Sequence, residues 1–214
     1  VIGYYNLENL FDTYDDPAHN DEEFLPDGAR HWTEAKYKKK LHNMATVIRA
    51  MHDDNGCWHT ILGVSEIENR LVLEDLVSQP EITEANYQIV HYDGPDRRGV
   101  DVALLYAPRK FMYVESESIP FNFKGTRVPI TLSPEEQANF RTRDILMVHG
   151  TIAGERFAFY VVHQPSRLGG KGNGLPSRGA ESIYNHAMGM MEKYPGIKSI
   201  LELWKLSSQA SRLS

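Results

Sequence analysis

The sequence of 214 residues contains one cysteine, no long apolar run and no excess of basic side chains. With Cys57 alone, the chain cannot form an internal disulfide. No apolar segment approaches the roughly 20 residues that a membrane-spanning helix needs. The formal charge of −6 argues against a protein that binds nucleic acid through a broad basic surface. A phosphate-bearing ligand stays open, because a metal ion or a few local arginines can supply positive charge.

The composition is that of a globular protein with a proper core, since 41% of the residues are apolar. The length suits one large domain or two small ones, and the sequence has no internal repeat. We assign residues 1–200 to one domain and residues 201–214 to an atypical tail. The chain begins at Val1 within strand-like sequence. Removal of a leader and export to the periplasm or the medium therefore stay open as alternatives.

Apolar runs, several of them alternating, predict a chain rich in strands. Strands are expected at 1–5, 57–64, 87–91, 100–106, 111–116, 144–150 and 157–162, the last two forming a hairpin across Ala153–Gly154. Helices are expected from an N-cap at Thr33 to about Met51, over 69–79 and over 180–194, with loops at 12–30 and 169–179. Many strands with few helices between them predict an α+β fold, a layered sandwich with flanking helices, and not a parallel βαβ sheet.

Three polar residues follow apolar strands: Asn6 after "VIGYY", Glu66 after "TILGVS" and His163 after "FAFYVV". Strand ends at one rim of a sandwich are a natural place for a site, because the scaffold holds side chains rigid while loops admit a ligand. Taken singly, each residue is more simply explained as a strand cap or a solvent-facing side chain. Taken together, a carboxylate suited to Mg²⁺, an amide that can ligate or orient and an imidazole that can protonate an oxygen indicate phosphoryl chemistry.

Five segments occur in a fixed order: "YYNLENLFDT", "ILGVSEIENR", "GPDRRGVDVALLY", "FRTRDIL" and "VVHQPSRLGG". Together they resemble the successive motifs of the endonuclease/exonuclease/phosphatase superfamily, the metal-dependent phosphoesterases related to pancreatic-type deoxyribonuclease, and most closely its bacterial branch. Each motif is weak alone, but the five extend over residues 1 to about 170. The resemblance implies a four-layered α/β-sandwich of two packed, mostly antiparallel sheets, in agreement with the strand pattern.

The resemblance also implies roles for individual residues. Asn6 resembles the Asn that positions metal and phosphate, Glu66 resembles the Mg²⁺-binding Glu, and His163 resembles the His that assists the departing or developing oxyanion. Arg143 matches a basic residue that contacts a substrate phosphate, for which the Arg fork is well suited. Glu68 is expected to support the site from outside it.

Further positions near the same rim are candidates for substrate contact. Ser166 and Arg167 belong to it, although a turn with a solvated Arg explains them equally well. Arg98, in "DRRGVDVALLY", lies just before the core strand expected at 100–106, and we expect the start of this strand to lie at the site. Gly99 would allow close approach of the backbone there. Arg98 is expected to pair with Asp101 and to shape the wall of the cleft. A solvated edge without a role is the alternative.

One departure from the family pattern concerns its C-terminal motifs. The family carries a general-base Asp in a "GDFN"-like strand and a terminal "DH"-like pair, whereas residues 202–214, "ELWKLSSQASRLS", contain no Asp, Asn or His. Three explanations stay open: a truncated or frame-altered chain, a part of a longer chain, and a half-domain that pairs with a second copy.

The sequence therefore predicts a phosphoesterase, of phosphodiesterase or nuclease type, in which a water activated by Mg²⁺ or Mn²⁺ attacks phosphorus. The expected partner is a phosphate ester, namely a nucleic acid, a nucleotide or a lipid head group. The alternative is an inactive or truncated domain that binds metal or phosphate ligands without turnover.

Overall fold

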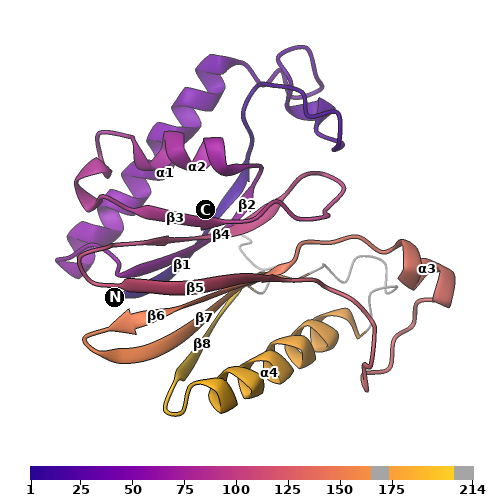
Figure 1. Ribbon diagram of the computed structural model, residues 1–214. Coiled ribbons are helices and arrows are strands. Elements are labelled where there is room, and N and C mark those ends of the chain that lie inside the picture. The colour runs from indigo at the N-terminus through magenta and orange to yellow at the C-terminus, as the bar shows by residue number, and fades with distance from the viewer. Residues whose placement is uncertain (165–173, 205–214) are drawn as a thin grey trace, which may run out of the picture.

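Two four-stranded sheets packed face to face form the centre of the protein (Figure 1). The computed structural model describes residues 1–164 and 174–204, with side chains up to residue 201. The first sheet has the order β1 (Ile2–Leu10), β2 (Ile61–Ile67), β4 (Asp101–Tyr106), β3 (Gln88–His91). The second has the order β5 (Met112–Ile119), β6 (Ile145–Ile152), β7 (Glu155–His163), β8 (Lys198–Trp204).

Each sheet combines one parallel pair with antiparallel neighbours. β1 is parallel to β2 and β7 is parallel to β8. The other neighbouring strands, β2–β4, β3–β4, β5–β6 and β6–β7, are antiparallel. The β6–β7 hairpin turns at Ala153 and Gly154, both with positive φ, as the sequence predicts. The prediction of mostly antiparallel sheets is therefore confirmed.

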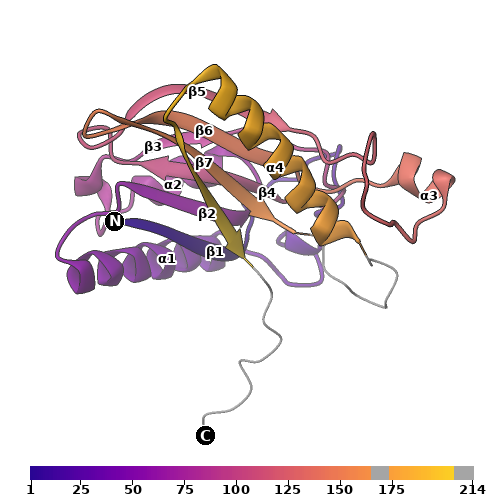
Figure 2. The same ribbon diagram turned by 90° about the horizontal axis from the view of Figure 1, so that it is seen from below.

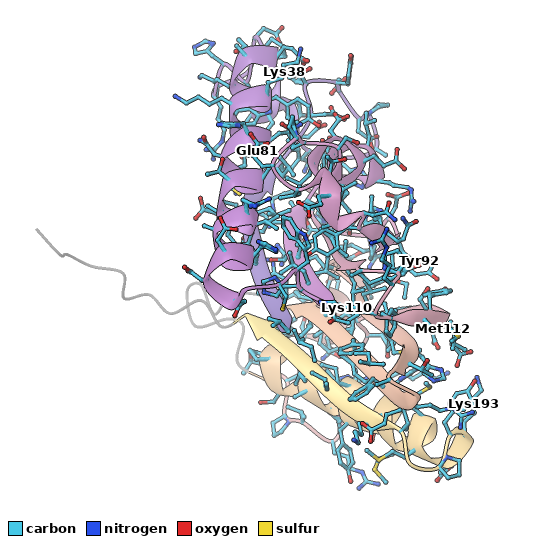
Figure 3. The ribbon with its side chains drawn as sticks, turned by 90° about the vertical axis from the view of Figure 1, so that its left-hand side faces the viewer. Lys38, Glu81, Tyr92, Lys110, Met112 and Lys193 are labelled. Carbon is cyan, nitrogen blue, oxygen red and sulfur yellow. The ribbon has the colours of Figure 1, made fainter. Side chains whose placement is uncertain are left out.

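Helices cover the outer face of each sheet and complete four layers. α1 (Glu34–Asn55) and α2 (Arg70–Val77) pack on the first sheet. α4 (Leu175–Lys193) packs on the second sheet and lies across it in Figure 2. In Figure 3, Lys38 of α1 and Lys193 of α4 mark the two opposite outer layers. The four-layered α+β sandwich predicted from the sequence is thus confirmed.

The core between the two sheets fixes how their rims face each other. It includes the fully buried side chains of Ile61, Leu104, Phe111, Val148 and Phe159. Burial of apolar surface at this scale stabilises the packing of β2 and β4 against β6 and β7. Residues at the ends of these strands are therefore held at a defined separation.

Several element boundaries differ from the predicted ones. Thr33 caps α1 as expected, accepting a hydrogen bond from the Lys36 amide, but the helix continues to Asn55, where Gly56 ends it in the left-handed region. Both β1 and β2 extend beyond the polar residues predicted to follow them, because their ladder resumes at Leu10 and Ile67.

Further elements are absent from the predicted set. A short helix, α3 (Pro134–Asn139), is held by a capping box between Ser133 and Glu136. Strand β8 includes residues on both sides of position 200, where the domain is predicted to end, and that boundary stays a prediction. Helix α4 begins at Leu175, inside the loop predicted at 169–179. Two short 3₁₀ turns, η1 (Glu22–Phe24) and η2 (Thr83–Ala85), lie in connecting segments. Within the described ranges, no helix combines the length and the apolarity needed to cross a bilayer.

The close approach of β5 to β6 depends on Gly150. A Cβ atom at this position would overlap the Phe111 ring and the Met112 carbonyl oxygen. We therefore expect Gly150→Ala to lower the free energy of unfolding by about 1–3 kcal/mol. Gly189→Ala is the matched control, because a Cβ on this exposed turn of α4 meets no atom within 4 Å. It is expected to raise the free energy of unfolding by about 0.5–1 kcal/mol. Urea unfolding measures both changes, and a shift of the same sign in the two variants would contradict this account.

Candidate functional site

Glu66 interrupts both ladders of β2. The pairing of β2 shifts register between Ser65 and Ile67, against β1 on one side and against β4 on the other. Glu66 has a φ of 59°, in the left-handed region that residues with a Cβ rarely adopt. Bulges of this kind redirect a side chain and are over-represented beside active sites. The redirected carboxylate lies with Oε1 3.5 Å from Nε2 of His163, on the other sheet.

Asn6 lies at the same rim. It pairs with Ser65, the residue before Glu66, in the β1–β2 ladder. Two consecutive left-handed residues, Glu8 and Asn9, then carry β1 around the irregularity. Oδ1 of Asn6 accepts a hydrogen bond of 2.7 Å from the Glu8 amide, which fixes the side chain. The prediction that Asn6 and Glu66 come after their strands is wrong, because each lies within a strand at an irregularity of the ladder.

His163 is the last residue of β7, one position beyond the predicted end of the strand, and it is 5% exposed. Burial and the positive charge of Arg143 lower the pKa of His163 to about 4, outweighing the opposite effect of Glu66. The imidazole is therefore neutral at pH 7, with one N–H donor and one acceptor nitrogen. Nδ1 is buried and has no hydrogen-bond partner within the described residues. Because the ring is neutral, it does not cancel the charge of the Glu66 carboxylate.

Asp96 joins two arginines beside the histidine. Its Oδ2 lies 3.8 Å from Nη2 of Arg143, and its Oδ1 lies 3.6 Å from Nε of Arg98. Arg143 is 9% exposed, and burial lowers the pKa of its guanidinium. Nε of Arg143 is also buried with no partner in the part of the chain that the structure describes. A buried guanidinium with an unused donor is suited to receive an anionic oxygen.

The expected ion pair between Arg98 and Asp101 is wrong. A turn closed by a hydrogen bond from the Gly99 amide to the Asp96 carbonyl brings Arg98 back onto Asp96. Asp101, at the start of β4, lies instead 3.3 Å from Nε2 of His91. The turn between Asp96 and Gly99 therefore determines which carboxylate Arg98 contacts.

A set of potential metal ligands that the sequence analysis did not identify lies at the start of β4. Ligand atoms of His91, Asp93 and Asp101 fall within 4.8 Å of one another. Burial raises the pKa of Asp101, which disfavours the charged carboxylate that a cation needs. The contact with His91 already gives Asp101 a polar partner. We therefore regard this set as a structural hydrogen-bonded cluster.

Glu68 supports the rim from outside. Its Oε2 accepts a hydrogen bond of 2.7 Å from the Asp12 amide. Burial, together with the nearby carboxylates of Asp12, Asp21 and Asp16, raises the pKa of Glu68 to about 8. Glu68 thus fixes the segment that follows β1 and does not enter the site.

The structure brings four of the predicted residues to one rim: Asn6, Glu66, Arg143 and His163. Arg98 lies behind them, on Asp96. Ser166 and Arg167 lie outside the described residues. Asp96 was missed in the sequence, although an acid two positions before Arg98 in "DRRG" is the signal that could have identified it.

Comparison with solved structures finds the same fold in several proteins of low sequence identity. A functionally unknown conserved protein from Enterococcus faecalis is 14% identical with a TM-score of 0.54, over 93% of this chain and 63% of that one. An endonuclease/exonuclease/phosphatase family protein from Bacteroides thetaiotaomicron is 18% identical with a TM-score of 0.51, over 93% and 60%. A mannosyl-6-phosphatase from the same organism is 18% identical with a TM-score of 0.50, over 93% and 62%. The chain thus spans less than two thirds of the length of these proteins.

No curated protein matches the sequence significantly. A model of the endonuclease/exonuclease/phosphatase family, in contrast, matches residues 1–198, which is most of the chain. The matched region contains Asn6, Glu66, Arg143 and His163. The chain therefore belongs to the endonuclease/exonuclease/phosphatase family.

Proposed function

We propose that the chain provides the metal- and phosphate-binding part of a phosphoesterase site that depends on Mg²⁺ or Mn²⁺. The observation that carries this proposal is the left-handed bulge at Glu66, which directs a carboxylate toward a neutral, buried His163. Family membership supports phosphate-ester hydrolysis as the reaction class. Nucleic acids, nucleotides and lipid head groups are the substrates that we consider.

The residues at the rim fit a hard divalent cation. The Glu66 side chain is 17% exposed, and the imidazole that lies 3.5 Å from its Oε1, that of His163, is neutral. Its negative charge is therefore available to a cation, with the Asn6 amide beside it. Mg²⁺ is commonly held by one or two carboxylates and keeps several waters, so one carboxylate and one amide are a sufficient protein contribution.

The chain's own residues would act on the phosphate as follows. Arg143 would donate its unused Nε–H and other guanidinium hydrogens to phosphoryl oxygens. His163, neutral at pH 7, would donate one hydrogen bond to an oxygen that gains charge during the reaction. Asp96 would hold the Arg143 guanidinium in place through its contact of 3.8 Å. A bound divalent ion would supply Lewis-acid polarisation of a phosphoryl oxygen.

A second candidate function is binding of metal or phosphate without turnover. It needs only the Glu66 carboxylate for a cation and the unused Nε–H of Arg143 for an anion, and no group that deprotonates water. The two functions share the rim and differ only in catalysis. Measurements of binding and of turnover on the same protein separate them.

Removal of the Glu66 charge tests the metal site. Glu66→Gln keeps the shape of the side chain, and we expect it to weaken Mg²⁺ binding at least about tenfold, equivalent to about 1.4 kcal/mol. Any hydrolysis of bis(p-nitrophenyl) phosphate should fall by about 10²-fold or more. Isothermal titration calorimetry measures the first change and a colorimetric assay the second.

Glu155→Gln is the matched control, because Glu155 is exposed on the β6–β7 hairpin and pairs with Lys198. It should change neither quantity. Unaltered Mg²⁺ affinity in Glu66→Gln would refute the metal site. Glu66-dependent Mg²⁺ binding without turnover in the wild type would support the second candidate.

Replacement of the Arg143 fork tests the phosphate contact. Arg143→Lys keeps the positive charge but loses the fork of donors, so the affinity for inorganic phosphate should fall about tenfold. Arg141→Lys is the matched control two residues away, because Arg141 is exposed and, among the described residues, donates to the carbonyls of Ala138 and Phe140. We expect it to change the dissociation constant less than about twofold. Titration followed by ³¹P NMR measures both, and equal effects of the two substitutions would contradict this role.

A further inference from the structure

A concave surface lies between the segment after β1 and the first turns of α1, and Glu8 of β1 belongs to its lining. It is an open groove of about 420 Å³, within the range of small-molecule sites. Three cationic side chains and two aromatic ones line it, together with Glu8: Arg30, Lys36, Lys40, Phe24 and Trp32. In Figure 1 the indigo segment that carries η1 lies beyond the end of β1, next to the start of α1. We call this surface the cationic groove.

The aromatic wall of the cationic groove is rigid. Nε1 of Trp32 donates a hydrogen bond of 3.0 Å to the Phe11 carbonyl. Phe24 is 8% exposed, stacks on Phe11 at 4.1 Å between ring centroids and contacts Trp32 edge to face at 6.1 Å. The part of Trp32 that lines the groove is thus held in one orientation, which is what a stacking surface requires.

The amines of the cationic groove have unused capacity. Lys40 donates to the Glu8 carbonyl at 2.6 Å and lies 5.9 Å from the Trp32 ring centre, while Lys36 donates to the Arg30 carbonyl at 2.7 Å. Each ammonium has three donors, so two remain on each. Among the described residues, neither Lys36 nor Lys40 has a carboxylate within 4.0 Å. Two ammonium groups that make no close carboxylate contact therefore face a groove in a chain whose formal charge is −6.

The cationic groove and the rim are joined through one residue, Glu8, by the two peptide groups on either side of it. The amide of Glu8 donates to Asn6 at the rim, and the carbonyl of Glu8 accepts from Lys40 in the groove. Burial, the largest effect, lowers the pKa of the Lys40 amine, while the charges of Glu8 and then of Glu66 act in the opposite direction. A ligand whose phosphate lies at the rim would therefore place its adjoining groups beside the groove.

We propose that the cationic groove is a substrate subsite, in which Lys36 and Lys40 bind a second phosphate of the ligand while Trp32 lies against its ring. The inference rests on the proposed function and narrows the substrate to a phosphate ester that carries another phosphate on a planar or sugar ring. Three features support this chemistry together: the volume, the two ammonium groups with unused donors and the fixed aromatic wall. A single phosphate without a ring would use only part of the groove.

The test compares two probes, adenosine 3′,5′-bisphosphate and adenosine 5′-monophosphate, by isothermal titration calorimetry on the full chain without metal. We expect the wild type to bind the bisphosphate at least about tenfold more tightly. In the Lys36→Gln/Lys40→Gln double variant the ratio should approach 1. Lys39→Gln, an exposed position on the same helix outside the groove lining, is the matched control and should keep the ratio.

Lys40 also donates to the Glu8 carbonyl, so the double variant could lose affinity through a change in folding. The single variant Lys36→Gln keeps this bond and therefore tests the groove separately. It should reduce the ratio at least about threefold with an unchanged unfolding midpoint. Equal affinity for the two probes in the wild type, or a ratio unaffected by both variants, would overturn the subsite. The probe ratio is measured without metal, whereas the metal site is tested separately by the Mg²⁺ affinity of Glu66→Gln. Failure of the proposed metal site is thereby distinguished from failure of the subsite.

Discussion

The interrupted pairing of β1 with β2 is the constraint on which the rest of the rim depends. The two strands run in register from Ile2 to Asn6, and then the ladder breaks at Glu66 and resumes at Leu10 with Ile67. A regular ladder would have placed Glu66 in strict alternation with its buried neighbours. The left-handed backbone instead turns the carboxylate toward the second sheet. A residue of this type is strained, and the surrounding ladders on both sides of β2 hold it there.

Burial determines the charge states at the rim. His163 stays neutral because a charged imidazole would lose its hydration and would face the Arg143 guanidinium. Arg143 keeps its place because Asp96 lies against it, and Asp96 also holds Arg98. The rim thus combines one uncancelled carboxylate with one buried cation. This is the arrangement that a divalent ion and a phosphate would complete together.

The irregularity in β1 provides backbone hydrogen bonds to both the rim and the cationic groove. Glu8 and Asn9, both left-handed, turn the chain so that the Glu8 amide donates to Asn6 and the Glu8 carbonyl accepts from Lys40. The formal charge of −6 for the whole chain gives no indication that Lys36 and Lys40 lie together in one groove. Charge totals describe the whole surface, whereas recognition depends on how a few side chains are placed.

The sequence by itself determined the strands from β1 to β7, the Thr33 cap of α1, the β6–β7 hairpin and the identity of the polar residues near the strand ends. Apolar periodicity, turn chemistry and capping are local properties, so they can be read without the fold. It did not determine that Glu66 and Asn6 lie inside their strands, that Arg98 pairs with Asp96, or that Lys36, Lys40 and Trp32 line one groove with Glu8. Those features depend on ladder register and on contacts between segments distant in sequence. Only the packed tertiary structure decides them, because a shift of one residue in a strand reverses the face to which every side chain points.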